Sequence, residues 1–160
     1  MFDYDFYVDD YALTIKGLVP EPSLCIKLKS LGFPQVSTGY FWTFETNLSL
    51  DLSQNGEPRL VCIKDLYAIF ADSQDNVYKL IKGTNFTELL VRAPTVPELM
   101  SAIPTEIWDT GVVLQRQGED YVFTLIKSSD RVDICSDRHL ANACAKLLIY
   151  LVQEDYISFD

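Results

Sequence analysis

Cys135 and His139 are the residues whose types and spacing come nearest to a nucleophile and its base. They flank the start of the predicted last helix, where a thiolate can have a lowered pKa. The alternative interpretation is structural: Cys135 ends an apolar strand, His139 lies in an exposed first turn, and Cys144 is on the core side of the helix. His139 is the only histidine, which excludes sites that need two imidazoles from one chain. We favour the structural interpretation and assign neither a catalytic residue nor a metal ligand here.

A second chemical alternative is the triplet Asp109-Thr110-Gly111, which follows apolar residues. It resembles the active-site triplet of retroviral-type aspartic proteases, in which two carboxylates share one proton and a dimer would supply the second Asp109. That family continues with a small residue and later has an apolar-apolar-Gly segment. Here Val112 follows, and Gly118 comes after Arg116-Gln117. The pattern favours a turn between a helix and the next strand.

The sequence patterns for binding calcium, phosphate or stacked bases are incomplete or absent. Asp3 and Asp5 resemble the start of a calcium loop, but the turn glycine is missing and Thr14 replaces the bidentate glutamate. The glycines are scattered singly, so no phosphate-binding loop is predicted. The aromatic run Tyr40-Phe41-Trp42 is compatible with base stacking, but such sites pair aromatic rings with a basic groove. Core packing explains this run better. We therefore predict no cofactor and no metal.

The charge balance restricts the partners of the chain. Asp and Glu number 23 against 13 Lys and Arg, which gives the 160 residues a net charge of −10. Phosphate backbones and anionic membrane surfaces repel such a chain, so direct binding to nucleic acid or membrane is disfavoured. Solubility alone explains the charge; the alternative is an acidic surface that occupies the site of a basic protein.

The sequence is typical of a cytoplasmic protein. The stretch MFDYDFYVDD has no basic n-region and no continuous apolar h-region, so no signal peptide is predicted. No apolar run is long enough to span a bilayer. Reduced, mostly buried thiols fit the cysteines, which form no C-x-x-C pair and are Cys25, Cys62, Cys135 and Cys144.

The last residues combine carboxylates with aromatic rings. Glu154, Asp155, Tyr156 and Phe159 follow the apolar part of the predicted last helix. They form either a frayed end or a contact for a basic partner. They are our candidate partner contact.

The longest predicted element is a helix over 136–156. Its apolar residues recur with a 3.6-residue period and define one core-facing stripe: Leu140, Ala143, Cys144, Leu147, Leu148, Leu151 and Val152. Ser136 or Asp137 is predicted to cap its first turn.

Two shorter helices are predicted from their end signals. One begins at a Ser23 cap and ends at Gly32. The other begins at Thr95, has Glu98 in capping-box spacing, and ends before Pro104.

Alternating or β-branched and aromatic runs predict several strands. They cover residues 2–8, 39–52, 59–63, 86–92, 112–114, 121–126 and 132–135. Residues 10–19 and 65–70 fit either a strand or a short helix. Runs of adjacent strands broken by single helices predict an α+β fold, with mainly antiparallel sheets covered by two or three helices. The chain length fits one domain over 1–160, or two small halves over 1–92 and 93–160.

Three stretches together resemble small uncharacterised proteins of gut anaerobic bacteria, which phages and other mobile elements often carry. They are LKSLGFPQ followed by Tyr40-Phe41-Trp42, then RAPTVPELMSAIP, then LANACAKLLIYLVQEDYI. The resemblance covers about a third of the chain and brings no catalytic residue with it. It implies a bacterial or phage origin.

We expect a non-catalytic binding or adaptor protein, because structural signals are abundant and no convincing catalytic set is present. The first alternative is an acidic inhibitor that mimics nucleic acid against a basic partner. The second is a small hydrolase that uses Asp109 or Cys135. The sequence leaves the partner and the oligomeric state open.

Overall fold

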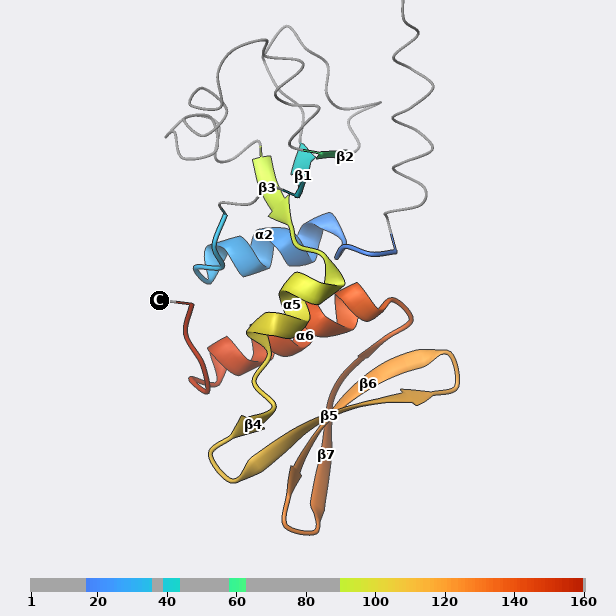
Figure 1. Ribbon diagram of the computed structural model, residues 1–160, viewed down its shortest axis with the longest axis vertical. Helices are drawn as coiled ribbons and strands as arrows, with labels where there is room; N and C mark the ends of the chain where they lie inside the picture. Colours follow the sequence, from blue (N-terminus) through green and yellow to red (C-terminus); the bar gives the residue numbers. More distant parts are fainter. Residues whose placement is uncertain (1–16, 36–38, 44–57, 63–89, 160) are drawn as a thin grey trace, which may run out of the picture.

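The computed structural model describes residues 17–35, 39–43, 58–62 and 90–159 (Figure 1). Several sequence predictions lie outside these ranges. They are the strand over 2–8, the undecided segments over 10–16 and 65–70, the rest of the strand beyond residue 43, and the calcium-like Asp3 and Asp5.

A small antiparallel sheet contains strands β1 (Tyr40–Thr43), β2 (Arg59–Cys62) and β3 (Leu90–Ala93), in the order β2-β1-β3. Tyr40 is paired with Cys62 on one side and with Ala93 on the other. The buried residues of this region form one cluster: Val19, Cys25, Trp42, Leu60, Val91 and Ala93. Trp42 is therefore a core residue, and its indole nitrogen donates a hydrogen bond to the Pro20 carbonyl at 2.9 Å.

Helix α2 (Pro22–Ser30) covers the small sheet. The predicted Ser23 cap is wrong, because Glu21 is the N-cap and Pro22 starts the helix. Proline fits the first helical position, where its missing N–H has no partner to lose. The predicted end is confirmed: Gly32 has φ +94°, a conformation that glycine adopts without steric cost.

Helix α5 (Val96–Ala102) begins with the predicted capping box. The Glu98 carboxylate accepts the backbone N–H of Thr95 at 2.7 Å and its hydroxyl at 2.9 Å. Leu99 is fully buried. The chain leaves the helix at Ile103, one residue before Pro104, as predicted.

Arg92 connects these elements. Its guanidinium donates to the Pro34 carbonyl and to the Glu98 carboxylate, both at 2.8 Å, and lies 5.2 Å above the Phe33 ring. Only 11% of the Arg92 side chain is exposed. Its Nε has no hydrogen-bond partner among the described residues. Arg92 therefore joins strand β3 to the segment that follows α2 and to α5.

A larger sheet contains strands β4 (Glu106–Ile107), β5 (Thr110–Gln117), β6 (Asp120–Lys127) and β7 (Asp130–Asp137) in sequential antiparallel order. The last three confirm the predicted strands, whereas the sequence does not predict β4. The hairpins of this sheet have two-residue loops, and the first loop residue has positive φ in each: Trp108 at 56°, Gly118 at 62° and Ser128 at 55°.

The last helix, α6 (Leu140–Gln153), is shorter than predicted. Ser136 and Asp137 belong to β7, where they pair with Val122 and Tyr121. The predicted Ser136 or Asp137 cap is therefore wrong, and His139 is the N-cap residue. The Asp137 carboxylate accepts the His139 backbone N–H at 2.8 Å and forms an ion pair with Lys146 at 2.8 Å.

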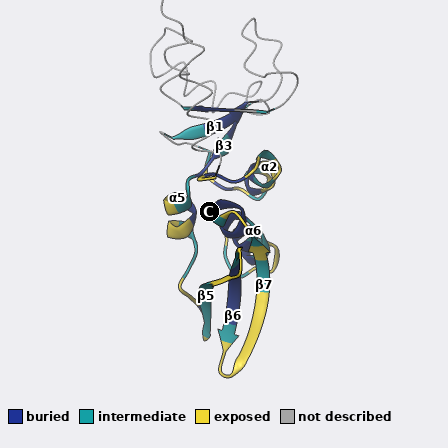
Figure 2. Ribbon diagram, turned by 90° about the vertical axis from the view of Figure 1, so that its right-hand side faces the viewer, coloured by how far each residue is buried: buried dark blue, intermediate teal, exposed yellow. Residues whose placement is uncertain are grey.

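The main core surrounds α6. Helices α2, α5 and α6 lie between the two sheets (Figure 1), and the dark buried face of α6 is visible in Figure 2. The predicted stripe is buried except for the half-buried Leu140 and Val152. It shares one core cluster with residues from five other elements or connections: Leu28, Phe33, Leu99, Ile107 and Phe123. The α+β class with antiparallel sheets, covering helices and a C-terminal helix is thus confirmed.

No helix in the described ranges combines the length and the apolar composition that a membrane crossing requires.

Candidate functional site

The structure places Cys135 on the core side of β7. Its thiol donates to the Ala143 carbonyl in α6 at 3.5 Å. Burial raises the pKa of Cys135 to about 11, although Lys146 opposes the shift. The thiol is therefore protonated at neutral pH, which is the inert form of cysteine.

Cys144 and His139, the other two candidate residues, do not form a site with Cys135. Cys144 is fully buried, and its thiol contacts the Met100 sulfur at 3.6 Å. Burial raises the pKa of Cys144 to about 12. His139 is exposed at the start of α6 and forms no hydrogen bond with Cys135. The three residues share one region without the contact that a nucleophile–base pair requires.

Asp109 lies in the tight turn between β4 and β5. A turn was predicted here, but between a helix and a strand, because the sequence does not reveal β4. Its carboxylate forms an exposed ion pair with Lys127 at 3.2 Å. Thr110 and Gly111 continue into β5, opposite Ile107 and Glu106. Within one described chain the triplet therefore has the geometry of a hairpin turn.

Trp108, the other residue of this turn, is the most exposed large apolar side chain in the described ranges, at 78%. Its φ of 56° lies in the left-handed region, which is unfavourable for a bulky side chain. In a two-residue hairpin loop the first position with positive φ normally carries glycine. Trp108 therefore combines backbone strain with an indole ring presented to solvent.

Aromatic rings after α6 support Trp108. Its ring contacts Tyr156 edge-on, with centroids 5.5 Å apart, and Tyr156 in turn lies 6.2 Å from Tyr150. Burial, Tyr156 and Glu154 raise the pKa of Tyr150, so Glu154 is also close to this group. We call this set the aromatic–acidic surface: Trp108, Asp109, Tyr150, Glu154, Asp155 and Tyr156.

The candidate partner residues of the C-terminal stretch divide between two places. Tyr156 belongs to the aromatic–acidic surface, and Glu154 and Asp155 are exposed beside it. Phe159 instead packs edge-on against Phe33, with centroids 5.1 Å apart. The stretch is thus folded against the protein through its rings, and its carboxylates face solvent.

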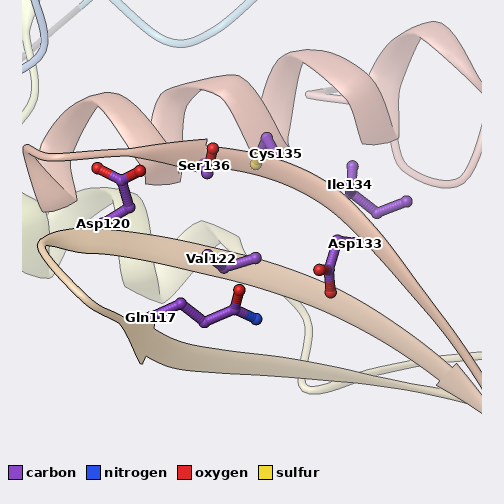
Figure 3. A pocket seen from close by; sticks show the side chains of 7 residues that line it. All are labelled: Gln117, Asp120, Val122, Asp133, Ile134, Cys135 and Ser136. Carbon is purple, nitrogen blue, oxygen red and sulfur yellow. The ribbon is translucent and has the colours of Figure 1, made fainter.

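The larger sheet carries a second candidate site on the face opposite α6. Strand pairing puts Gln115, Val122 and Ser136 in one row of this face, and Val113, Thr124 and Asp133 in the next. A depression of about 280 Å³ opens here, as Figure 3 shows with α6 behind the strands. Its lining residues are Gln117, Asp120, Val122, Asp133, Ile134, Cys135 and Ser136.

A short polar ladder fixes one wall of this depression. The Gln115 amide donates to the Thr124 hydroxyl at 3.1 Å, and that hydroxyl donates to the Asp133 carboxylate at 2.7 Å. Neither Asp133 nor Asp120 forms an ion pair with any other described residue. The depression is therefore an anionic surface with an apolar floor at Val122.

The described residues contain no cluster of His, Cys, Asp or Glu that fits a metal ion. Comparison with known proteins adds no assignment, because no protein-family model, curated protein or solved structure matches the chain.

The sequence predicted Glu154, Asp155 and Tyr156 as a partner contact, but it pointed neither to Trp108 nor to the depression. Trp108 directly precedes the Asp-Thr-Gly triplet in the sequence. A large aromatic residue at the tip of a two-residue turn was the available signal, since such loops favour Gly, Asn and Asp.

Proposed function

We propose that the protein is a non-catalytic binding module that recognises a basic partner protein through the aromatic–acidic surface. The observation that carries the proposal is the strained and exposed conformation of Trp108. Residues held in unfavourable φ regions concentrate at functional sites, where the surrounding structure maintains the strain. The edge-on contact with Tyr156 supplies part of that support.

The chemistry of the surface fits a cationic partner. Tryptophan and tyrosine dominate the binding energy of many protein interfaces. Lysine and arginine side chains bind the faces of such rings. Glu154 acts electrostatically on Tyr150, and Asp109 and Asp155 directly adjoin Trp108 and Tyr156 in the sequence. All three are exposed and would accelerate association with a positively charged partner.

The two other functions receive less support from the geometry. A hydrolase needs an activated nucleophile, but Asp109 is held in an exposed ion pair and the Cys135 thiol has a raised pKa. A nucleic-acid mimic needs an ordered carboxylate array, and more than half of the acidic residues lie outside the described ranges. Neither has an observation comparable to Trp108.

We also propose a cytoplasmic location. All four cysteines are free, and two of them are fully buried. Unpaired thiols of this kind are typical of proteins in reducing compartments.

Trp108 itself provides the test. In a Trp42→Phe background it is the sole tryptophan, so its fluorescence reports binding of short synthetic peptides rich in Lys or Arg. We expect the fluorescence to change with basic peptides and not with peptides in which Glu replaces the cations. In calorimetry, Trp108→Gly should weaken binding about tenfold or more, because a central aromatic contact is removed.

Leu18→Ala is the matched control, since Leu18 is another exposed apolar side chain and lies far along the chain from the surface. It should leave the affinity unchanged. Equal affinities for Trp108→Gly and wild type would reject the aromatic–acidic surface as the binding site. Binding that depends only on peptide charge and not on Trp108 would favour the nucleic-acid mimic.

A further inference from the structure

Strand β7 has an open edge. It is the last strand of the β4-β5-β6-β7 sheet, and no strand in the described part of the chain pairs with its outer side. Residues 130–133 are exposed, and Figure 2 shows this half of the strand in yellow. Toward its other end, Lys146 binds the Ser136 carbonyl at 3.2 Å and covers the edge. The first half of β7 therefore offers free backbone donors and acceptors to another strand.

The two faces beside this edge differ chemically. Asp133 lies on the face that carries the anionic depression, together with Asp120. Val132 lies on the opposite face, in the row of Leu125, and is 56% exposed. Successive side chains of a strand added to β7 would alternate between these two surroundings.

We infer that β7 receives an extended segment of a partner protein in which basic and apolar residues alternate. This inference rests on the sheet alone and does not depend on the aromatic–acidic surface. Backbone hydrogen bonds to β7 provide the affinity, and the alternate side chains provide the specificity. A lysine or arginine beside Asp133 extends over the apolar floor at Val122 toward Asp120, and an apolar neighbour covers Val132.

The net charge of the protein favours a basic segment over a second copy of the chain as the strand that pairs with β7. Two copies would each bring a net charge of −10, which opposes association. The exposed edge also covers only residues 130–133 before the irregularity of pairing opposite Phe123 and Thr124. Such a short pairing is small for a stable dimer. A basic segment instead neutralises the carboxylates of Asp120 and Asp133, neither of which has an ion-pair partner among the described residues.

The probe for this inference is an acetylated peptide of alternating Lys and Val. We expect it to bind in calorimetry and to slow amide hydrogen exchange at residues 130–133. The same peptide with alternate backbone nitrogens methylated should not bind, because it has lost the donors for strand pairing. A peptide of alternating Glu and Val should not bind either.

Charge variants of the protein test the depression. The double variant Asp120→Asn, Asp133→Asn should bind the Lys-Val peptide about fivefold more weakly. The amide oxygen introduced at position 133 can still accept the Thr124 hydrogen bond, so the polar ladder is kept. The control is Asp130→Asn, which removes one carboxylate from β7, the strand of Asp133, but on the opposite face. It should change affinity about twofold or less.

Four outcomes would overturn the inference. They are absence of peptide binding, equal binding of the methylated peptide, binding without protection of residues 130–133, and an equal loss for Asp130→Asn. A fifth result, a wild-type dimer in sedimentation that Val132→Lys dissociates, would show that a second copy occupies the edge instead.

Discussion

The indole ring of Trp108 lies edge-on against the phenol ring of Tyr156, at a centroid distance of 5.5 Å and an angle of 64° between the planes. The contact joins the β4–β5 turn to the segment that follows α6. Edge-on aromatic pairs contribute about 0.5–1.5 kcal/mol beyond the area they bury. This is the same order as the cost of a left-handed backbone at a residue with a side chain. The pair therefore helps to hold a tryptophan where glycine is the usual residue.

The backbone strain at Trp108 can be tested by stability measurements without any partner. Trp108→Ala loses the Tyr156 contact and keeps the left-handed strain, whereas Trp108→Gly loses both. We expect Trp108→Gly to be more stable than Trp108→Ala by about 1 kcal/mol. Urea unfolding of the two variants measures the difference directly. The reverse order would show that the turn carries no strain.

Arg92 should be one of the most sensitive charged residues. Arg92→Ala removes two hydrogen bonds, the contact with Phe33 and the ion pair with Glu98. We expect a loss of about 3 kcal/mol in the free energy of unfolding. Arg92→Lys should restore only part of it, because an ammonium cannot reproduce the planar fork.

The control for Arg92 is Arg138→Ala. Arg138 forms an ion pair with Glu119 at 3.3 Å, but both side chains are about three-quarters exposed, at 74% and 76%. The expected change is within about 0.5 kcal/mol. Similar losses for the two variants would mean that Arg92 does not connect the elements around it.

Stability should fall in acid through Glu98. Burial alone would raise the pKa of Glu98, but hydrogen bonds from Thr95 and Arg92 outweigh it and the pKa is lowered. The unfolded chain therefore binds the proton more readily, so this contribution is complete above the ordinary value of 4.5 and is lost as the pH falls through the lowered one. Glu98→Gln removes this titration. Between about pH 6 and pH 3, the midpoint temperature of thermal unfolding should therefore fall less steeply for Glu98→Gln than for wild type. Parallel curves would contradict the prediction.

The cysteines should be slow to react in the folded protein. Burial raises the pKa of Cys135 from 9.0 to about 11. Iodoacetamide near neutral pH should therefore modify Cys135 about a hundredfold more slowly than an ordinary thiol, because only the thiolate reacts. Peptide mapping over time measures the rate, and urea should restore it. Rapid alkylation of native Cys135 would instead support the hydrolase hypothesis.

Local signals in the sequence predicted most of the secondary structure in the described ranges. The apolar stripe of α6, the Thr95–Glu98 capping box and the glycine after α2 act within a few residues, so periodicity and composition reveal them. The sequence prediction starts α6 too early because Ser136 and Asp137 pair with β6. A residue with a favourable capping side chain does not cap a helix when its backbone already pairs within a sheet.

The candidate surfaces depend on tertiary contacts that no local pattern encodes. Trp108 and Tyr156 are far apart along the chain and meet only because α6 returns toward the β4–β5 turn. The depression depends on which residues of three strands share a row, and an irregularity opposite Phe123 and Thr124 shifts that register. Strand β4, with two residues, is too short for a periodic signal.

The hydrogen bond between Asn142 and Glu21 bears on the order in which the core forms during synthesis. The buried Asn142 side chain accepts the backbone N–H of Glu21 at 2.9 Å, across 121 residues of sequence. At about 5–20 residues per second, a ribosome would release α6 roughly ten seconds after α2. Throughout that interval Leu28 lacks the α6 residues of its core cluster. The nascent chain therefore carries an apolar helix face that chaperones can bind until translation reaches the last helix.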